Sequence, residues 1–93
     1  MFEVRYHPDA VREMERLRAF DRARILNAIG KFLVTGPMEL GRNIKRIALP
    51  GGGFVYQLRV GDYRVFYDVD AGVRVALIEH VRHKGRKTTG EIL

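Results

Sequence analysis

The fold is decided by residues 54–69, which read FVYQLRVGDYRVFYDV. Apolar and aromatic side chains occupy every second position on both sides of a Gly61-Asp62 pair, and this period of two is typical of half-buried β-strands. A Gly-X pair between two such runs is the signal of a two-residue type II′ turn. The stretch therefore predicts an antiparallel β-hairpin with Gly61 and Asp62 at its tip.

This turn determines which residues of the hairpin face each other. On one face Arg59 lies directly across from Arg64. Like charges in directly opposite positions destabilise a sheet, but two arginines can together bind an anion such as a phosphate. We expect this arginine face to bind an anionic partner. The other face covers the core, and it carries the pairs Val60 with Tyr63, Leu58 with Val65, Tyr56 with Tyr67, and Phe54 with Val69.

Residues 73–81, VRVALIEHV, predict a third strand, because they are rich in β-branched residues and follow a turn at residues 70–72. A three-residue loop puts Val73, Val75 and Leu77 on the face toward the helices. The arginine face then receives Arg74, Ala76, Ile78, His80 and Arg82. A two-residue loop would reverse the assignment and place charged side chains in the core, so we favour the longer loop.

The first half of the chain predicts a strand and two helices. Residues 2–6 alternate like a short strand, Pro8 suits the first turn of a helix, and Asp21 is a candidate N-cap of a second helix. Residues 43–49 are a short strand or an extended segment. The predicted fold is α+β, with an N-terminal strand and an antiparallel two-helix hairpin on one face of a mainly antiparallel sheet of three to four strands. Residues 1–93 are expected to form one domain.

The composition limits the class of function. The 93 residues include 17 Lys and Arg against 11 Asp and Glu, so the net charge is +6 and the expected partner is anionic. The absence of cysteine excludes disulfides and thiol nucleophiles. No apolar run approaches the roughly 20 residues that span a membrane. We expect a cytoplasmic protein without a membrane partner and without a metal, since its three histidines lack a metal-ligand spacing.

Positive side chains gather on the predicted arginine face. The candidate phosphate-binding residues are Arg59, Arg64, Arg82, Lys84, Arg86 and Lys87, with His80 beside them. An alternative interpretation is that Arg59 and Arg64 form ordinary surface ion pairs with Asp68, Glu79 or another carboxylate. Three converging cations repel one another and need compensation, which favours the anion site.

Residues 58–67, LRVGDYRVFY, resemble the LRVGDYRVIY hairpin of the RelE/ParE superfamily of toxins from bacterial and archaeal toxin–antitoxin modules. The strand–helix–helix order, the length and the basic charge are similar too. The resemblance implies a type II toxin that a cognate antitoxin protein neutralises. For the RelE branch it implies a ribosome-dependent endoribonuclease that cleaves mRNA and thereby inhibits translation. There the RNA 2′-OH is the nucleophile, and neither a metal nor a cofactor takes part.

The resemblance also implies roles for particular residues. Arg64 corresponds to a catalytic arginine of the hairpin and Arg82 to a second one, although Lys84 or Arg86 could take that second place. The RelE lysines before the turn fall at Val55 and Gln57 in this chain, and the upstream Lys45 and Arg46 are their candidate substitutes. Thr88 and Thr89 stand where many members carry a tyrosine, so the candidate general base is His80 or His83.

Three functions remain open from the sequence, of which the third and least favoured is that of a weakened toxin or a nucleic-acid-binding module. The first is the mRNA endonuclease, with Arg64, Arg82 and His80 as its catalytic residues. The second is that of the ParE branch, which shares the scaffold but inhibits DNA gyrase and lacks the nuclease residues. The arginine cluster favours the first function, whereas the replaced lysines and the missing tyrosine favour the second.

Overall fold

The hairpin predicted from residues 54–69 is present in the computed structural model, which describes residues 1–85. Strands β3 (Phe54–Val60) and β4 (Tyr63–Asp70) pair antiparallel, with Val60 opposite Tyr63 and Arg59 opposite Arg64. Gly61 has a φ of +58°, whereas Asp62 has no positive φ. A type II′ turn requires a positive φ only at its first central residue, so the turn is of the predicted kind.

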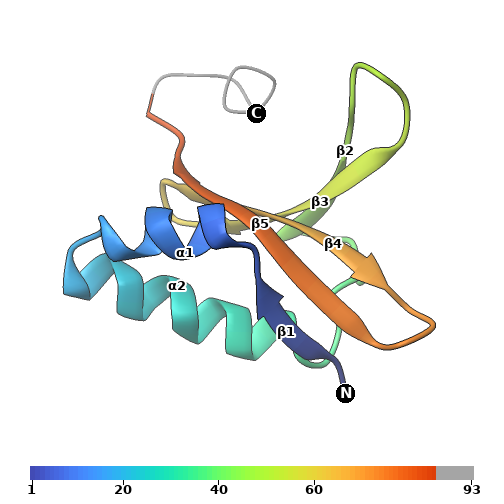
Figure 1. The fold of residues 1–93 in the computed structure, drawn as a ribbon, viewed down its shortest axis with the longest axis horizontal. Coiled ribbons are helices and arrows are strands. Elements are labelled where there is room, and N and C mark those ends of the chain that lie inside the picture. The colour runs from blue at the N-terminus through green and yellow to red at the C-terminus, as the bar shows by residue number, and fades with distance from the viewer. Residues whose placement is uncertain (86–93) are drawn as a thin grey trace.

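The sheet has five strands in the order β1-β5-β4-β3-β2, one more than the upper end of the prediction. Strand β2 (Ile44–Ala48) pairs antiparallel with β3, so the ambiguous segment is a true strand. Strand β1 (Glu3–Tyr6) pairs parallel with β5 (Val75–His83). Figure 1 shows both helices on one side of this sheet, which leaves its other face uncovered by helix. The predicted α+β architecture is confirmed.

The helices are α1 (Pro8–Glu15) and α2 (Ala19–Phe32). Pro8 begins α1 as predicted, and the ring nitrogen Nδ1 of His7 caps it by accepting from the Asp9 N–H at 3.0 Å. The prediction that Asp21 caps the second helix was wrong, because Arg18 is the N-cap and Asp21 lies in the first turn. There the Asp21 carboxylate accepts a hydrogen bond from the Tyr63 hydroxyl at 3.1 Å, which ties α2 to the hairpin.

The core lies between the helices and the apolar face of the hairpin. Ile25 of α2 and Leu33, the C-cap residue of this helix, are fully buried, as are Leu58 and Val65 of the hairpin. Tyr67 is also fully buried, and its hydroxyl donates to the Pro37 carbonyl oxygen at 2.6 Å. This bond fixes the segment after α2 to the centre of the sheet. The predicted core face of the hairpin is therefore correct except at Phe54, which is exposed and lies outside the core.

The third strand departs from the prediction in its first half. The loop before β5 has four residues, 71–74, and Arg74 takes a φ of +57°. Because of the longer loop, Ala76 and Ile78 lie in the core, whereas Val75 and Leu77 lie on the opposite face.

A β-bulge then reverses this offset. Ile78 is opposite Tyr67 but His80 is opposite Phe66, so Glu79 has no partner on β4. An extra residue shifts the alternation by one. His80 and Arg82 consequently lie on the arginine face, as the sequence predicted. Within residues 1–85, neither helix is long and apolar enough to cross a membrane.

Candidate active site

Three arginines stand side by side on the uncovered face of the sheet. Arg59 of β3 is opposite Arg64 of β4, which is in turn opposite Arg82 of β5. We call these residues the arginine row. Neighbouring strands are about 4.8 Å apart, so the backbone alone brings three cations into one short line. The sheet thus builds the cluster that the hairpin register predicted.

Arg64 is the buried member of the row, with 6% of its surface exposed. Its Nη1 donates to the carbonyl oxygens of Gly61 at 2.8 Å and Tyr63 at 2.9 Å, so the guanidinium braces the hairpin turn. Burial lowers the pKa of Arg64, and the neighbouring charge of Arg59 lowers this pKa further. Arginine remains charged at neutral pH all the same. Among residues 1–85, no carboxylate forms an ion pair with Arg64.

Glu13 of α1 organises the other end of the row. Strand β1 ends at Tyr6 while β5 continues to His83, so the second half of β5 is an open edge. The Glu13 carboxylate occupies this edge: its Oε1 accepts from the Val81 N–H at 3.0 Å, and its Oε2 accepts from Arg82 Nε at 3.2 Å. Arg82 therefore forms an ion pair with a carboxylate from the helix, whereas the alternative interpretation expected ion pairs of Arg59 and Arg64.

His80 joins the same group of side chains. Its Nδ1 lies 3.3 Å from Glu13 Oε1 and 3.2 Å from Arg82 Nη2. The other candidate base, His83, is opposite Tyr63, and the two rings meet edge to face at 5.1 Å. Tyr63 packs against the core, so His83 lies on the helix side of the sheet. Only His80 of the two is beside the arginine row.

The upstream pair of basic residues is split between the two faces. Lys45 is opposite Gln57, next to Arg59 along β3, and so it shares the face of the arginine row. Arg46 is opposite Tyr56 and its guanidinium stacks over the Phe54 ring at 4.1 Å. The structure therefore brings Lys45 to the candidate site and does not bring Arg46 there. Phe54 was predicted to lie on the core face, but its side chain is 40% exposed and lies outside the core.

The basic residues after β5 begin beside the hairpin turn. The Lys84 N–H donates to the Asp62 carbonyl oxygen at 2.7 Å, which holds the end of β5 next to the turn and to Arg64. Arg86 and Lys87, together with Thr88 and Thr89, lie outside the described residues. Lys84 is thus the one member of the predicted basic tail whose place beside the site is known.

Two depressions meet at His80. A shallow polar hollow of about 170 Å³ lies between α1 and β5, and it is lined by Asp9, Arg12, Glu13, Arg16, His80 and Arg82. A larger groove of about 550 Å³ runs over the sheet toward β2, with Val55 and Phe66 among its apolar lining and Asp68, Glu79 and His80 among its polar lining. His80 therefore stands between a charged hollow and a mostly apolar groove.

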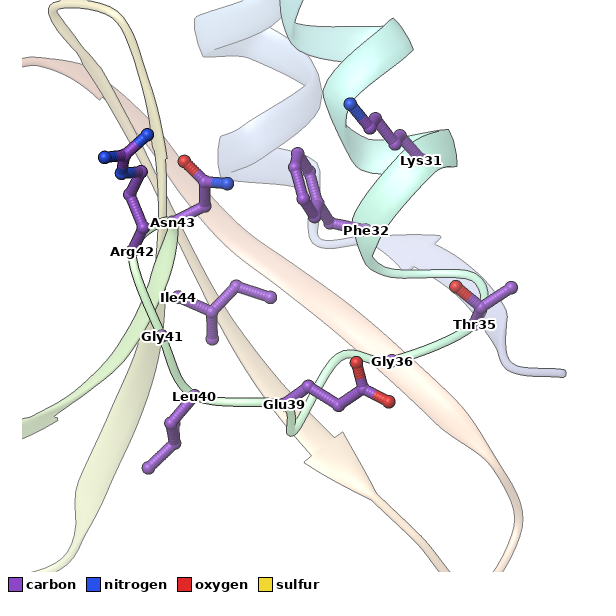
Figure 2. A pocket seen from close by; sticks show the side chains of 10 residues that line it. All are labelled: Lys31, Phe32, Thr35, Gly36, Glu39, Leu40, Gly41, Arg42, Asn43 and Ile44. Carbon is purple, nitrogen blue, oxygen red and sulfur yellow. The ribbon is translucent and has the colours of Figure 1, made fainter.

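A third hollow, of about 260 Å³, is separate from this site. It lies where α2 ends and β2 begins, and Figure 2 shows Phe32 facing Asn43 and Ile44 across it. Lys31 and Arg42 add positive charge to its rim, and Glu39 adds negative charge. None of the residues predicted for the site lines this hollow, so we do not include it in the site.

Comparison with known proteins identifies the family. Residues 4–88 match the model of a family described as the ParE toxin of the type II toxin–antitoxin system parDE. The chain belongs to this family of toxins. The predicted membership of the RelE/ParE superfamily is thereby confirmed. None of the curated proteins matches the sequence.

Solved structures of RelE proteins share the fold of this ParE-family toxin. The archaeal RelE–RelB complex from Pyrococcus horikoshii OT3 is 26% identical with a TM-score of 0.73, over 91% of this chain and 97% of that one. The RelBE2 toxin–antitoxin complex from Mycobacterium tuberculosis is 23% identical with a TM-score of 0.72, over 88% and 96%. The intact RelBE complex from E. coli is 17% identical with a TM-score of 0.60, over 89% and 96%.

The sequence reasoning missed Glu13, the acidic residue of the site. It lies on a helix some 67 residues away along the chain from His80. In the sequence it looks like one of several charges on the solvent side of α1. One feature of the sequence could have pointed to such a residue, namely that the N-terminal strand is short and the last strand is long. Part of the last strand then has no neighbouring strand, and its backbone N–H groups need an acceptor from another element.

Proposed function

We propose that this ParE-family toxin is a ribosome-dependent endoribonuclease that cleaves mRNA and so inhibits translation. The observation that carries the proposal is the convergence of His80 with the arginine row on the uncovered face of the sheet. Transfer of a phosphodiester to the neighbouring 2′-OH needs a base and cations for the charge that develops on phosphorus. This group of side chains can supply both.

The proposed reaction begins at the ribose beside the scissile phosphate. His80 takes the proton of the 2′-OH, and the 2′-oxygen forms a bond to phosphorus. Arg64 and Arg82 stabilise the negative charge on the phosphorane oxygens. The bond from phosphorus to the 5′-oxygen then breaks, and that oxygen takes up a proton from water, beside the Arg82 cation. The products are a 2′,3′-cyclic phosphate and a free 5′-hydroxyl, so atoms and charge balance.

The basic residues around the site support a path for the RNA strand. Arg59 and Lys45 extend the positive face across β3 and β2, and Lys84 extends it past the end of β5. We assign Arg86 and Lys87 to the same proposed path on the basis of the sequence alone. Cations that contact phosphates give affinity and position rather than sequence preference.

The proposed partner of the free toxin is a cognate antitoxin. The similar solved structures include complexes of RelE with RelB, and those from Mycobacterium tuberculosis and Methanococcus jannaschii are described as toxin–antitoxin complexes. This chain exposes large apolar side chains on its helices and on the following loop, namely Phe20, Leu26, Met38 and Leu40. Exposed apolar surface on a chain of charge +6 suits an acidic, amphipathic antitoxin segment.

A second function, inhibition of DNA gyrase without nuclease chemistry, is favoured by one specific observation. The RelE lysine positions on β3 hold Val55 and Gln57, which are 6% and 0% exposed. Neither Val55 nor Gln57 places a positive charge in the groove beside the arginine row. The matching family model also describes ParE toxins. On this alternative the cationic face would bind a protein or DNA without cleaving RNA.

Induced expression with two parallel readouts distinguishes these functions. Mapping of mRNA 5′ ends reports cleavage, and trapping of gyrase on DNA reports gyrase inhibition. We expect new mRNA 5′ ends with the unaltered chain, and their loss in the Arg82→Ala variant. Arg46→Ala is the matched control, because it removes the same charge from the opposite face of the sheet. Growth arrest with intact mRNA and damaged DNA would support the gyrase alternative instead.

A further inference from the structure

We propose that Glu13 is the positioning residue of the site, because it fixes the proton of His80 on Nδ1 and thereby leaves Nε2 as the base. This inference rests on the proposed nuclease function. Glu13 lies on α1, outside the hairpin and the last strand that supply the other site residues. Its role would be to act through His80 and Arg82 rather than on the RNA.

One ring nitrogen of His80 has two competing neighbours. His80 Nδ1 lies 3.3 Å from Glu13 Oε1 and 3.2 Å from Arg82 Nη2. A neutral imidazole carries its proton on one nitrogen only. If Nδ1 carries it, Nδ1 donates to Glu13 and Nε2 has a free electron pair. If Nδ1 instead accepts from Arg82, Nε2 carries the proton and cannot act as a base.

The charge of Glu13 decides between these two arrangements. A hydrogen bond to a carboxylate is stronger than one between neutral groups. Arg82 Nε already donates to Glu13 Oε2 at 3.2 Å, so this arginine is held without needing His80 as its acceptor. The same carboxylate therefore satisfies Arg82 and draws the imidazole proton toward itself. This is the logic by which a buried acid orients a catalytic histidine in serine proteases.

The position of Glu13 is itself fixed by the backbone. Its Oε1 accepts from the Val81 N–H at 3.0 Å, which occupies the open edge of β5. Since Val81 lies between His80 and Arg82, the carboxylate is held midway between the two side chains that it would control. The bulge at Glu79 sets this arrangement, because without it the three residues would exchange faces.

The variant Glu13→Gln distinguishes the orientation of His80 by Glu13 from the mere capping of the open edge of β5. A glutamine carbonyl oxygen can still accept from the Val81 N–H, so the edge stays capped. Its NH₂ group would face the Arg82 Nε–H, donor against donor, and its neutral carbonyl oxygen would hold the Nδ1 proton of His80 less strongly than the carboxylate does. Arg82 would then turn to His80 Nδ1. We expect the imidazole proton to move to Nε2 and the cleavage rate at saturating substrate to fall about 100-fold, the lower end of what a general base contributes. We expect KM to change little, since the phosphate-binding arginines remain.

The experiment combines ¹⁵N NMR of the histidine rings with cleavage of mRNA on purified ribosomes. The ring nitrogens of His80 report the tautomer of the neutral ring in the purified chain, with assignment from a His80→Gln variant. Glu15→Gln is the matched control, as it removes the same charge from an exposed position of α1. Thermal unfolding checks that each variant is folded.

The expected result is Nδ1–H in the unaltered chain and in Glu15→Gln, and Nε2–H with slow cleavage in Glu13→Gln. An unaltered chain with its proton on Nε2 would overturn the inference without any variant. So would a Glu13→Gln variant that cleaves as fast as the parent. No cleavage by the unaltered chain, whatever the tautomer, would overturn the proposed function and this inference with it.

Discussion

Arg64 combines a structural task with its proposed catalytic one. Its buried guanidinium bonds to two carbonyl oxygens of the hairpin turn while it faces the arginine row. A residue on the uncovered face of a sheet would ordinarily be replaced at little cost to stability. Here the side chain is buried and hydrogen-bonded, so function and fold are coupled at one position.

The first prediction concerns this coupling. Arg64→Ala should lower the free energy of unfolding by about 1–3 kcal/mol, because two turn carbonyls lose a charged donor, and it should also abolish growth inhibition. Urea denaturation and a growth assay measure the two effects. Arg59→Ala is the control, since Arg59 is exposed and should leave stability within about 0.5 kcal/mol of the parent. An Arg64→Ala chain as stable as the parent would refute the bracing role.

For individual residues, the sequence predicted the arginine row but not Glu13, the carboxylate that pairs with Arg82. Arg59 and Arg64 follow from the hairpin alternation alone, because a two-residue turn leaves one possible register. Glu13 could not be found in the same way. Its contacts with His80 and Arg82 depend on where α1 packs against β5, which no local pattern specifies.

Among the elements, the β3–β4 hairpin depends most on a single backbone conformation. Gly61 has a φ of +58°, and a Cβ built there would lie 2.5 Å from Nη2 of Arg24 on α2. We expect Gly61→Ala to lower the free energy of unfolding by about 1–2 kcal/mol, the cost of left-handed backbone for a residue with a Cβ. Denaturant titration measures this loss.

Gly51→Ala provides the matched control for the turn. Gly51 has no positive φ, and a Cβ there would have no atom within 4 Å. Its replacement should leave stability unchanged or raise it by a few tenths of a kcal/mol, about the gain from a less flexible unfolded chain. Equal effects of the two substitutions would contradict the assignment of a strained turn at Gly61.

For the last strand, the sequence did not determine which side chains face the core. The alternation of residues 73–81 fits either face, so the loop length decides which side chains enter the core. Neither the four-residue loop nor the bulge at Glu79 has a sequence signal as clear as Gly61-Asp62. The two unforeseen features compensate each other, and this is why His80 and Arg82 lie on the expected face although Ala76 and Ile78 do not.

For the molecule as a whole, the buried tyrosine Tyr67 makes stability depend on pH. Burial raises the pKa of Tyr67 well above its ordinary value, and the neighbouring Tyr56 raises this pKa further. In the unfolded chain the tyrosine pKa is about 10. The folded state therefore holds the proton more tightly, so this stabilisation is complete below about pH 10 and is lost as pH rises toward the folded-state pKa.

We expect the free energy of unfolding to fall with increasing pH above about 10, and to fall less steeply in a Tyr67→Phe variant. At neutral pH the same variant should be less stable by about 1 kcal/mol or more, because the Pro37 carbonyl loses its donor. Urea titrations at several pH values measure both effects. Identical slopes for parent and variant would exclude Tyr67 as the source.

The whole-molecule claim is that an uncovered, cationic sheet face on a toxin fold positions RNA for attack by its own 2′-OH. The most direct test is cleavage of an mRNA with a single 2′-deoxynucleotide at the mapped cut site, on purified ribosomes with the purified chain. We expect the ribose substrate to be cut to a 2′,3′-cyclic phosphate and the 2′-deoxy substrate to stay intact at that position. Equal cutting of both substrates, or no cutting of either, would contradict it.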